Sequence, residues 1–344
     1  MHNKAYKNKY DTHLQQGNGF IRKNEFYLGQ HESNVHAIAI TPDGRTAVSA
    51  SQDKTIKIWN LVTRQCIRTL RGHTRPVLSI GITSDSKTII SGSEDGEIRF
   101  WNVVDNSCSI PPECHNSDVW AIAVSRKKHI AISSSMDKTI AWNVKSRSKV
   151  FEFNGSENSD CAVAITSSAH RLVSSSNNGV IKIWSGISGR CLHEIDASPF
   201  GPTCVAIDDT GHLVIAGMAN NILKVWDVDR ESVLRVLEGH SALPTCISIT
   251  GDGRFAVTGS FDNYIKLWDV EKGYCIKNIR ANHDVVSCLA ITPDGCMGVA
   301  GSWDNTIKII SFFRDTGENS ITFAKPSIIQ SSGKKHFILT RKQK

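Results

Sequence analysis

The chain has 344 residues, of which 40% are hydrophobic and 21% charged, proportions that are ordinary for a soluble globular protein. No run of 18 apolar residues occurs in it, which excludes a membrane-spanning helix. The net charge of +7 comes from the ends: residues 1–30 carry five Lys/Arg against two Asp/Glu, and residues 312–344 carry seven against two. The body between them is nearly neutral, which argues against a broad nucleic-acid interface on it.

Residues 1–19 are polar and basic, with no apolar segment behind them, so we expect no conventional secretory leader. The ten cysteines form no C-x-x-C pair and no zinc-ligand spacing. Three of them, Cys204, Cys246 and Cys288, recur 42 residues apart at a position that holds small residues elsewhere, where a thiol behaves as a small hydrophobe. We therefore expect free thiols and a reducing, cytoplasmic location without cofactor or metal; a nuclear location or non-classical secretion are the alternatives.

A tryptophan returns every 41 or 42 residues through the body of the chain. The six positions are Trp59, Trp101, Trp142, Trp184, Trp226 and Trp268. One further step of 42 residues reaches Ile310, at the end of a segment that otherwise matches the others. A repeat of about 40–45 residues that ends in this way is typical of four-stranded propeller blades, and seven copies make one closed ring.

Residues 73–114 illustrate how one unit folds. Three β-rich segments at 76–82, 88–93 and 97–101 are separated by turn-forming residues, and 108–110 supply a fourth, outer strand. The repeat predicts units at about 31–72, 73–114, 115–155, 156–197, 198–239, 240–281 and 282–311. The last unit lacks an outer strand, and residues 24–31 align with 67–73, which precede a unit, so the segment 20–30 is predicted to close the ring.

The sequence thus predicts an all-β fold: a single seven-bladed propeller of four-stranded antiparallel blades over residues 20–311. The ring is closed by the N-terminal strand pairing with the last blade. Residues 1–19 and 312–344 are basic extensions outside it. We expect the propeller to be monomeric by itself.

Two short motifs carry a resemblance to a known family. Units five and six end in Trp226-Asp227 and Trp268-Asp269, and Gly-His pairs stand at Gly72-His73 and Gly239-His240. With these motifs, residues 31–311 resemble the WD-repeat family. The resemblance implies a hydrogen-bond chain through Trp, Ser/Thr, His and Asp in each complete unit, because a buried indole and a buried imidazole require partners.

Four units carry the whole set. These are His31, Ser49, Asp53 and Trp59; His73, Ser91, Asp95 and Trp101; His115, Ser133, Asp137 and Trp142; and His240, Thr258, Asp262 and Trp268. Units four, five and seven lack members of the set, so we expect those blades to rely on packing alone. Unit three is one residue short between Asp137 and Trp142, which predicts a bulged or re-registered third strand.

No phosphate-binding loop, zinc-protease motif or nucleophile elbow is present, so we predict no catalytic residues. In WD-repeat proteins the face that carries the inter-blade loops is the usual binding face. Six residues fall at positions predicted to point there: His36, Leu78, Trp120, Met136, Phe261 and Trp303. The alternative is that these side chains only pack on the next blade; both interpretations stand for Trp120 and Trp303, and packing is preferred for the other four.

The resemblance implies a non-catalytic scaffold or adaptor that binds a protein or peptide on this top face. The loops at 154–160 and 196–202 are a second candidate contact. One alternative is a substrate-recognition subunit or effector module of a larger complex such as a ubiquitin ligase. An alternative of another class is a binder of nucleic acid or anionic surfaces through the basic tails.

Overall fold

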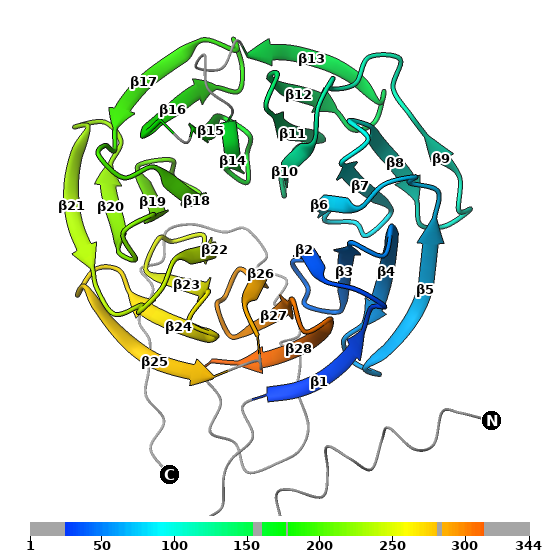
Figure 1. Cartoon of the computed structure of the whole chain (residues 1–344). Coiled ribbons are helices and arrows are strands. Elements are labelled where there is room, and N and C mark those ends of the chain that lie inside the picture. Colours follow the sequence, from blue (N-terminus) through cyan, green and yellow to red (C-terminus); the bar gives the residue numbers. More distant parts are fainter. Residues whose placement is uncertain (1–24, 154–159, 177, 281–283, 313–344) are drawn as a thin grey trace, which may run out of the picture.

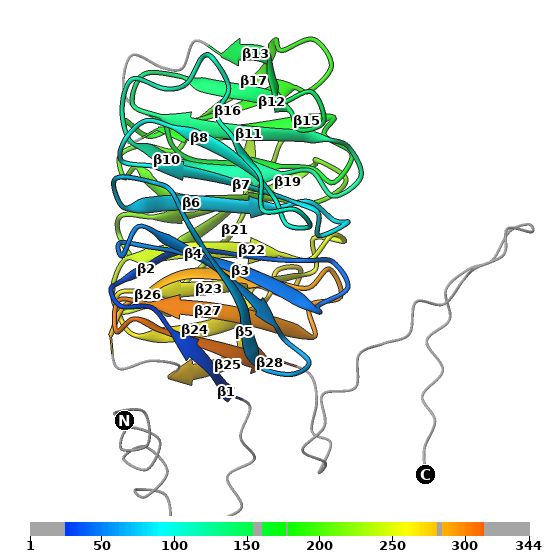
Figure 2. The ribbon, with the colours of Figure 1, turned by 90° about the vertical axis from the view of Figure 1, so that its right-hand side faces the viewer.

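The computed structural model describes residues 25–153, 160–176, 178–280 and 284–312. Seven four-stranded antiparallel sheets stand around a central opening, each with its first strand innermost (Figure 1). Seen edge-on, they form a flat disc whose strands run from one face towards the other (Figure 2). The predicted seven-bladed propeller is confirmed. Within the described residues, no helix is long and apolar enough to cross a lipid bilayer.

The first four blades follow one another along the chain. Blade one comprises β2 (Val35–Ile40), β3 (Thr46–Ser51), β4 (Thr55–Asn60) and β5 (Gln65–Arg71). Blade two comprises β6 (Val77–Ile82), β7 (Thr88–Ser93), β8 (Ile98–Asn102) and β9 (Cys108–Ser109). Blade three comprises β10 (Val119–Val124), β11 (Ile130–Ser135), β12 (Thr139–Asn143) and β13 (Ser148–Phe153). Blade four comprises β14 (Asp160–Ile165), β15 (Arg171–Ser176), β16 (Val180–Ser185) and β17 (Cys191–Asp196).

The last three blades repeat the same order. Blade five comprises β18 (Pro202–Ile207), β19 (Leu213–Met218), β20 (Leu223–Asp227) and β21 (Ser232–Leu237). Blade six comprises β22 (Pro244–Ile249), β23 (Phe255–Ser260), β24 (Tyr264–Asp269) and β25 (Tyr274–Arg280). Blade seven comprises β26 (Val286–Ile291), β27 (Met297–Ser302), β28 (Thr306–Ser311) and, from the other end of the described chain, β1 (Glu25–Gln30).

The hydrophobic core lies between neighbouring blades. Trp101 of blade two, for example, belongs to one buried cluster with Val48 and Ile58 of blade one and Ile89 of its own blade. All six residues of β6 are buried, whereas most residues of the outer strand β5 are exposed. Each blade therefore buries both faces of its inner strands against its neighbours, which explains why these strands are apolar on both sides.

The ring closes where β1 pairs antiparallel with β28, from Glu25 opposite Ile310 to Gln30 opposite Thr306. Leu28 is buried in the cluster that contains Trp59 and Ile309. The predicted closure by the N-terminal strand is confirmed, and β28 acquires an outer neighbour instead of an unpaired edge. The predicted beginning of this strand at residues 20–24 and the two basic extensions lie outside the described residues, apart from Phe312, and the predicted domain boundaries stay predictions.

Gly29 permits the close approach between the closing strand and blade one. A Cβ atom added there would lie 2.4 Å from Cζ3 and 2.6 Å from Cη2 of Trp59. We therefore expect Gly29→Val to lower the free energy of unfolding by about 1–3 kcal/mol through overpacking. Urea denaturation followed by tryptophan fluorescence measures this change. A variant as stable as the wild type would contradict the contact.

The two faces of the disc carry different turns. On the face that we call the top, the turn between the second and third strands meets the start of the first, as in the bond from Gln52 N to Asn34 O at 2.9 Å. On the opposite face, the bottom, the turn between the first two strands meets the turn between the last two. There Leu61 N donates to Arg45 O at 2.9 Å.

The shortened third unit keeps the pairing register of the other blades. β12 shifts register against β13 between Ala141 and Trp142, but β4 makes the equivalent shift against β5 in a unit of full length. The prediction that the missing residue would bulge or re-register the third strand was therefore wrong. β11 and β12 pair without a break, and Trp142 lies opposite Ala131 as Trp59 lies opposite Ala47 in blade one. The missing residue falls in the top turn, where Ser135 N donates to Lys138 O at 3.1 Å. A tighter turn costs less free energy than a one-residue slip of β12, because the slip would turn every side chain of the strand to the opposite face of the sheet.

Candidate partner-binding surface on the top face

A buried hydrogen-bond chain supports the top turn of blade one. Trp59 Nε1 donates to Ser49 Oγ at 2.8 Å, and His31 Nε2 lies 2.7 Å from the same oxygen. Nδ1 of His31 lies 2.8 Å from Oδ2 of Asp53, which also accepts a bond from Glu32 N at 3.0 Å. Because Asp53 is in the top turn, the chain links the core to the surface and holds the turn in one conformation.

Equivalent bonds occur in the three other complete units. They join His73, Ser91, Asp95 and Trp101 in blade two; His115, Ser133, Asp137 and Trp142 in blade three; and His240, Thr258, Asp262 and Trp268 in blade six. Among the described residues, His73, Asp95 and Glu97 also form a group of three potential metal ligands. Both ring nitrogens of His73 are already engaged by Asp95 and Ser91, so the group is structural.

The hydrogen bonds shift the acidities of the carboxyl groups. Burial alone would raise the pKa of Asp95, but bonds from His73 and from the Glu97 backbone outweigh it and lower the pKa to about 2. The pKa of Asp53 is lowered further, against the same burial effect, by His31 and Thr55. These carboxylates therefore stay ionised in the folded protein well below the pH at which free aspartic acid is protonated.

The incomplete blades differ from one another. Blade four keeps one bond, from Trp184 Nε1 to Ser174 Oγ at 3.0 Å, so the expectation that it relies on packing alone was wrong. The indole needs only the hydroxyl and not the histidine. In blade five Ala216 replaces the hydroxyl, and Oδ1 of Asn220 is buried without a hydrogen-bond partner among the described residues. In blade seven Ala300 and Ile310 are fully buried.

On the top face, four of the six predicted contact residues are exposed. The exposed fractions are 41% for Trp120, 57% for Met136, 38% for Phe261 and 37% for Trp303. Trp120 and Met136 both belong to blade three. Phe261 and Trp303 occupy the top turns of blades six and seven, where their backbone nitrogens donate to Leu243 O and Val285 O.

Phe261 and Trp303 form one apolar group across two blades. Their ring centroids are 5.2 Å apart and their planes are nearly perpendicular, at 87°. Edge-to-face packing of this kind stabilises a pair of rings beyond the area it buries. Each ring therefore limits the mobility of the other while more than a third of its surface stays exposed, which suits an anchor for a partner.

Two of the predicted contact residues are less accessible. Leu78 is only 8% exposed, because it lies in β6, whose six residues are all buried, so it offers almost no surface to a partner. His36 is partly buried, and burial lowers its pKa. The alternative interpretation, packing within the ring, therefore describes Leu78 better than a binding role does.

One exposed aromatic was missed. Phe200, in the loop between β17 and β18, is 45% exposed on the top side of blade five. It belongs to the second candidate contact at 196–202, but repeat alignment does not single it out because inter-blade loops vary in sequence. Of the companion loop at 154–160, only Asp160, the first residue of β14, lies within the described residues.

The central channel has few charged side chains among the described residues that line its cavities. Two cavities of about 200 and 190 Å³ lie along the inner strands and share Val124, Arg126 and Ser248. The residues that line them are mostly apolar, and the charged ones among them are Arg126 and Asp209. Oδ1 of Asp209 accepts a bond from Ser167 N at 3.1 Å. Arg126 and Asp209 are thus the charged groups among the described residues that line these two cavities.

The repeat geometry agrees with the comparison with known families. A family model described as the IFT122 first beta-propeller matches residues 34–311. The chain belongs to this family. Its WD-repeat character places it among the β-propeller protein-interaction folds.

Several curated fungal proteins resemble short stretches of the chain. A probable E3 ubiquitin ligase complex SCF subunit sconB from Talaromyces stipitatus is 43% identical over 58 residues, which are 17% of this chain and 9% of that protein. The nuclear distribution protein PAC1 of Scheffersomyces stipitis is 51% identical over 49 residues, 12% of this chain and 9% of that protein. The matched stretches thus span about a tenth of these relatives.

Proposed function

We propose that the protein is a non-catalytic scaffold or adaptor that binds a protein or peptide on the top face of the propeller. The observation that carries the proposal is the exposed pair of Phe261 and Trp303, held edge to face across two blades. Trp120 and Met136 supply a second apolar contact on blade three. Aromatic side chains that are rigid before binding lose little conformational entropy on contact, and they dominate the energetics of protein interfaces.

A role as substrate-recognition subunit or effector module of a larger complex is the more specific form of this proposal. It is supported by the stretch similar to sconB, which is named as a subunit of an SCF ubiquitin ligase complex. We further propose a reducing, cytoplasmic environment, because the nine described cysteines are all free. Cell fractionation tests the location: recovery in an oxidising or extracellular fraction would contradict it.

The double variant Trp120→Ala with Trp303→Ala tests the top face. Loss of two anchors is expected to weaken partner binding by roughly thirtyfold or more. The free energy of unfolding should change by only about 1 kcal/mol, because both side chains are partly in water. Affinity capture from native lysate, followed by quantitative mass spectrometry and then titration of the captured partner, measures the loss.

A matched control changes two exposed aromatics away from the top face. Tyr27 on β1 and Tyr274 on β25 are 57% and 50% exposed on outer strands. The double variant Tyr27→Ala with Tyr274→Ala should capture partners as the wild type does. Equal capture by the Trp120/Trp303 variant and the wild type would show that these two side chains do not form the binding surface.

A further inference from the structure

The bottom face has an uneven distribution of charge that the net charge of the body conceals. The bottom turns of blades three and four span residues 125–129, 144–147, 166–170 and 186–190, and contain no Asp or Glu. Their cations are Arg126, Lys127, Lys128, Lys145, Arg147 and Arg190. The corresponding turns of blades five and six, at 208–212, 228–231, 250–254 and 270–273, hold six Asp/Glu against three Lys/Arg. We call the turns of blades three and four the basic sector.

Backbone hydrogen bonds bring the turns of the basic sector together. Within each blade the two turns are joined, by Val144 N to His129 O at 2.8 Å and by Gly186 N to His170 O at 2.9 Å. Between the blades, Lys127 N donates to Ser167 O at 2.8 Å. Residues from four separate segments therefore form one continuous surface, to which the segment 125–129 contributes three of the six cations.

Among the described residues, two of the six cations of the basic sector interact with an acid, Arg126 with Asp209 and Arg147 with Asp105, and the other four do not. Lys127, Lys128, Lys145 and Arg190 are exposed, and none of the four forms an ion pair within the part of the chain that the structure describes. On blade two, Asp85 accepts from Thr83 Oγ1 and Asp105 accepts from Asn102 Nδ2. These neutral donors leave both carboxylates charged, but neither carboxylate forms an ion pair with Lys127, Lys128, Lys145 or Arg190 among the described residues.

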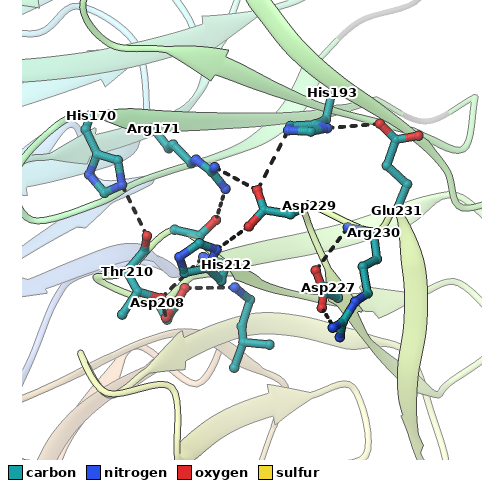
Figure 3. A network of polar contacts seen from close by, with 12 residues as sticks. His170, Arg171, His193, Asp208, Thr210, His212, Asp227, Asp229, Arg230 and Glu231 are labelled. Carbon is teal, nitrogen blue, oxygen red and sulfur yellow. Dashed lines mark hydrogen bonds and ion pairs between the residues drawn. The ribbon is translucent and has the colours of Figure 1, made fainter.

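At the border with blade five, the acids are also engaged (Figure 3). Asp229 accepts a bond from Arg171 at 2.8 Å and contacts Nδ1 of His212, and Glu231 lies 2.9 Å from Nδ1 of His193. Uncompensated positive charge therefore remains on blades three and four, where an anionic partner would be attracted.

Exposed apolar side chains stand next to these cations. The third residue after each blade's tryptophan is at the tip of the outer bottom turn. From blade one to blade six these residues are Val62, Val104, Lys145, Ile187, Asp229 and Glu271. Ile187 is 83% exposed and Val104 73% exposed, more than any other large hydrophobic side chain of the described residues. Ile187 N and Val104 N donate to the side chains of Ser185 and Asn102, so the tight turns hold both side chains outwards.

We propose that the basic sector, with Val104 and Ile187 on either side of Lys145, docks peripherally on an anionic lipid bilayer. Lysine and arginine are attracted to the negative headgroups. Ile187 and Val104 reach past them to the apolar boundary, as the apolar residues of interfacial helices do. Exposed cations beside exposed apolar side chains match a bilayer surface, which offers anionic headgroups and an apolar boundary together. An acidic peptide would neutralise the cations but leave both tips in water. The propeller would then hold its top face, with any bound protein, away from the membrane.

The test is co-sedimentation of the 344-residue chain with vesicles of phosphatidylcholine alone or mixed with phosphatidylserine, at physiological salt. We expect binding to the mixed vesicles only, weakening as salt is raised. The double variant Lys127→Gln with Lys128→Gln should bind roughly thirtyfold more weakly. Ile187→Ser, which leaves the charge unchanged, should also weaken binding several-fold, because an isoleucine side chain is lost from the apolar boundary.

A matched control removes two cations from the acidic half of the same face. Arg230→Gln with Lys272→Gln makes the same change in net charge, at side chains that are 77% and 58% exposed. This variant should bind as the wild type does within about twofold.

Equal binding by the Lys127/Lys128 variant and the wild type would overturn the proposal and point to the basic extensions instead. Absence of wild-type binding to the mixed vesicles would overturn it as well. Binding of polyglutamate, sensitive to Lys127 and Lys128, together with indifference to vesicles, would show that the basic sector receives an acidic protein and not a membrane.

Discussion

Replacing Trp101 by alanine is expected to lower the free energy of unfolding by about 3–5 kcal/mol. The side chain is 4% exposed and packs between blades one and two. Its removal leaves a large cavity between the blades and deprives Ser91 Oγ of the bond from the indole, which measures 2.8 Å. The variant loses buried apolar area and also breaks the hydrogen-bond chain. Its free energy of unfolding should therefore fall more than that of a variant with a substitution on the surface.

Urea denaturation followed by circular dichroism measures this change, with Trp303→Ala as the matched control. Both variants lose one indole, but Trp303 is 37% exposed and stands in a top turn. We expect the control to lose about 1 kcal/mol or less. Similar losses for the two variants would contradict the assignment of Trp101 to the structural core and of Trp303 to the surface.

Acid is expected to destabilise the propeller steeply between about pH 4 and pH 2. Asp95, whose pKa falls from 3.8 to about 2, is ionised in both the folded and the unfolded chain above this range. There its hydrogen bonds stabilise the fold in full. As the pH falls, the unfolded chain takes up the proton first, and the stabilisation is lost. The pKa values of Asp53, Asp137 and Asp262 are lowered in the same direction, against the effect of burial, so their losses add.

Because of His115, the free energy of unfolding should begin to fall at a higher pH. Burial is the main reason that its pKa lies below 6.5, so the unfolded chain binds this proton more readily than the folded one. Its stabilising effect therefore begins to decline as the pH falls below about 6.5. Asp95→Asn, which does not titrate, should reduce the stability lost between pH 4 and pH 2 by about 2 kcal/mol. Urea denaturation across this range measures the slope; a slope unchanged by Asp95→Asn would contradict the hydrogen-bonded carboxylate.

The repeat made the architecture predictable from the sequence. Trp59 and its counterparts mark the third strand of each blade, and the alignment of residues 24–31 with 67–73 located the closing strand. Both inferences assume that equivalent positions have the same structural role in every unit. Predictions based on the repeat were wrong where one unit differs locally from the others. The missing residue near Asp137 shortens a turn, and Trp184 keeps its bond to Ser174 without the histidine.

Surface features were harder to predict because they depend on side chains from several units. Leu78 and Trp120 hold equivalent positions, yet one is 8% and the other 41% exposed. Phe261 and Trp303 are 42 positions apart in the sequence, and neither local sequence predicts that their rings pack edge to face. The basic sector is harder still to predict from the sequence, because acidic residues elsewhere bring the net charge of the body close to zero.

The two proposed surfaces lie on opposite faces of the disc, and their binding should differ in its dependence on salt. The top face depends on rigid apolar anchors, so its binding should depend weakly on salt. The bottom face depends on Lys127, Lys128 and their neighbours, so its binding should weaken steeply as salt is added. A protein with both surfaces would hold a partner beside a membrane.

Photo-crosslinking tests most directly whether the top face binds a protein. The residue p-benzoylphenylalanine is introduced in place of Phe261 on the top face and, as a control, in place of Tyr274 on the outer rim. After irradiation in native lysate, we expect position 261 to capture a specific protein and position 274 to capture none. Capture of the same protein from position 274 alone, or of no protein from position 261, would contradict the proposal that this propeller is a scaffold acting through its top face.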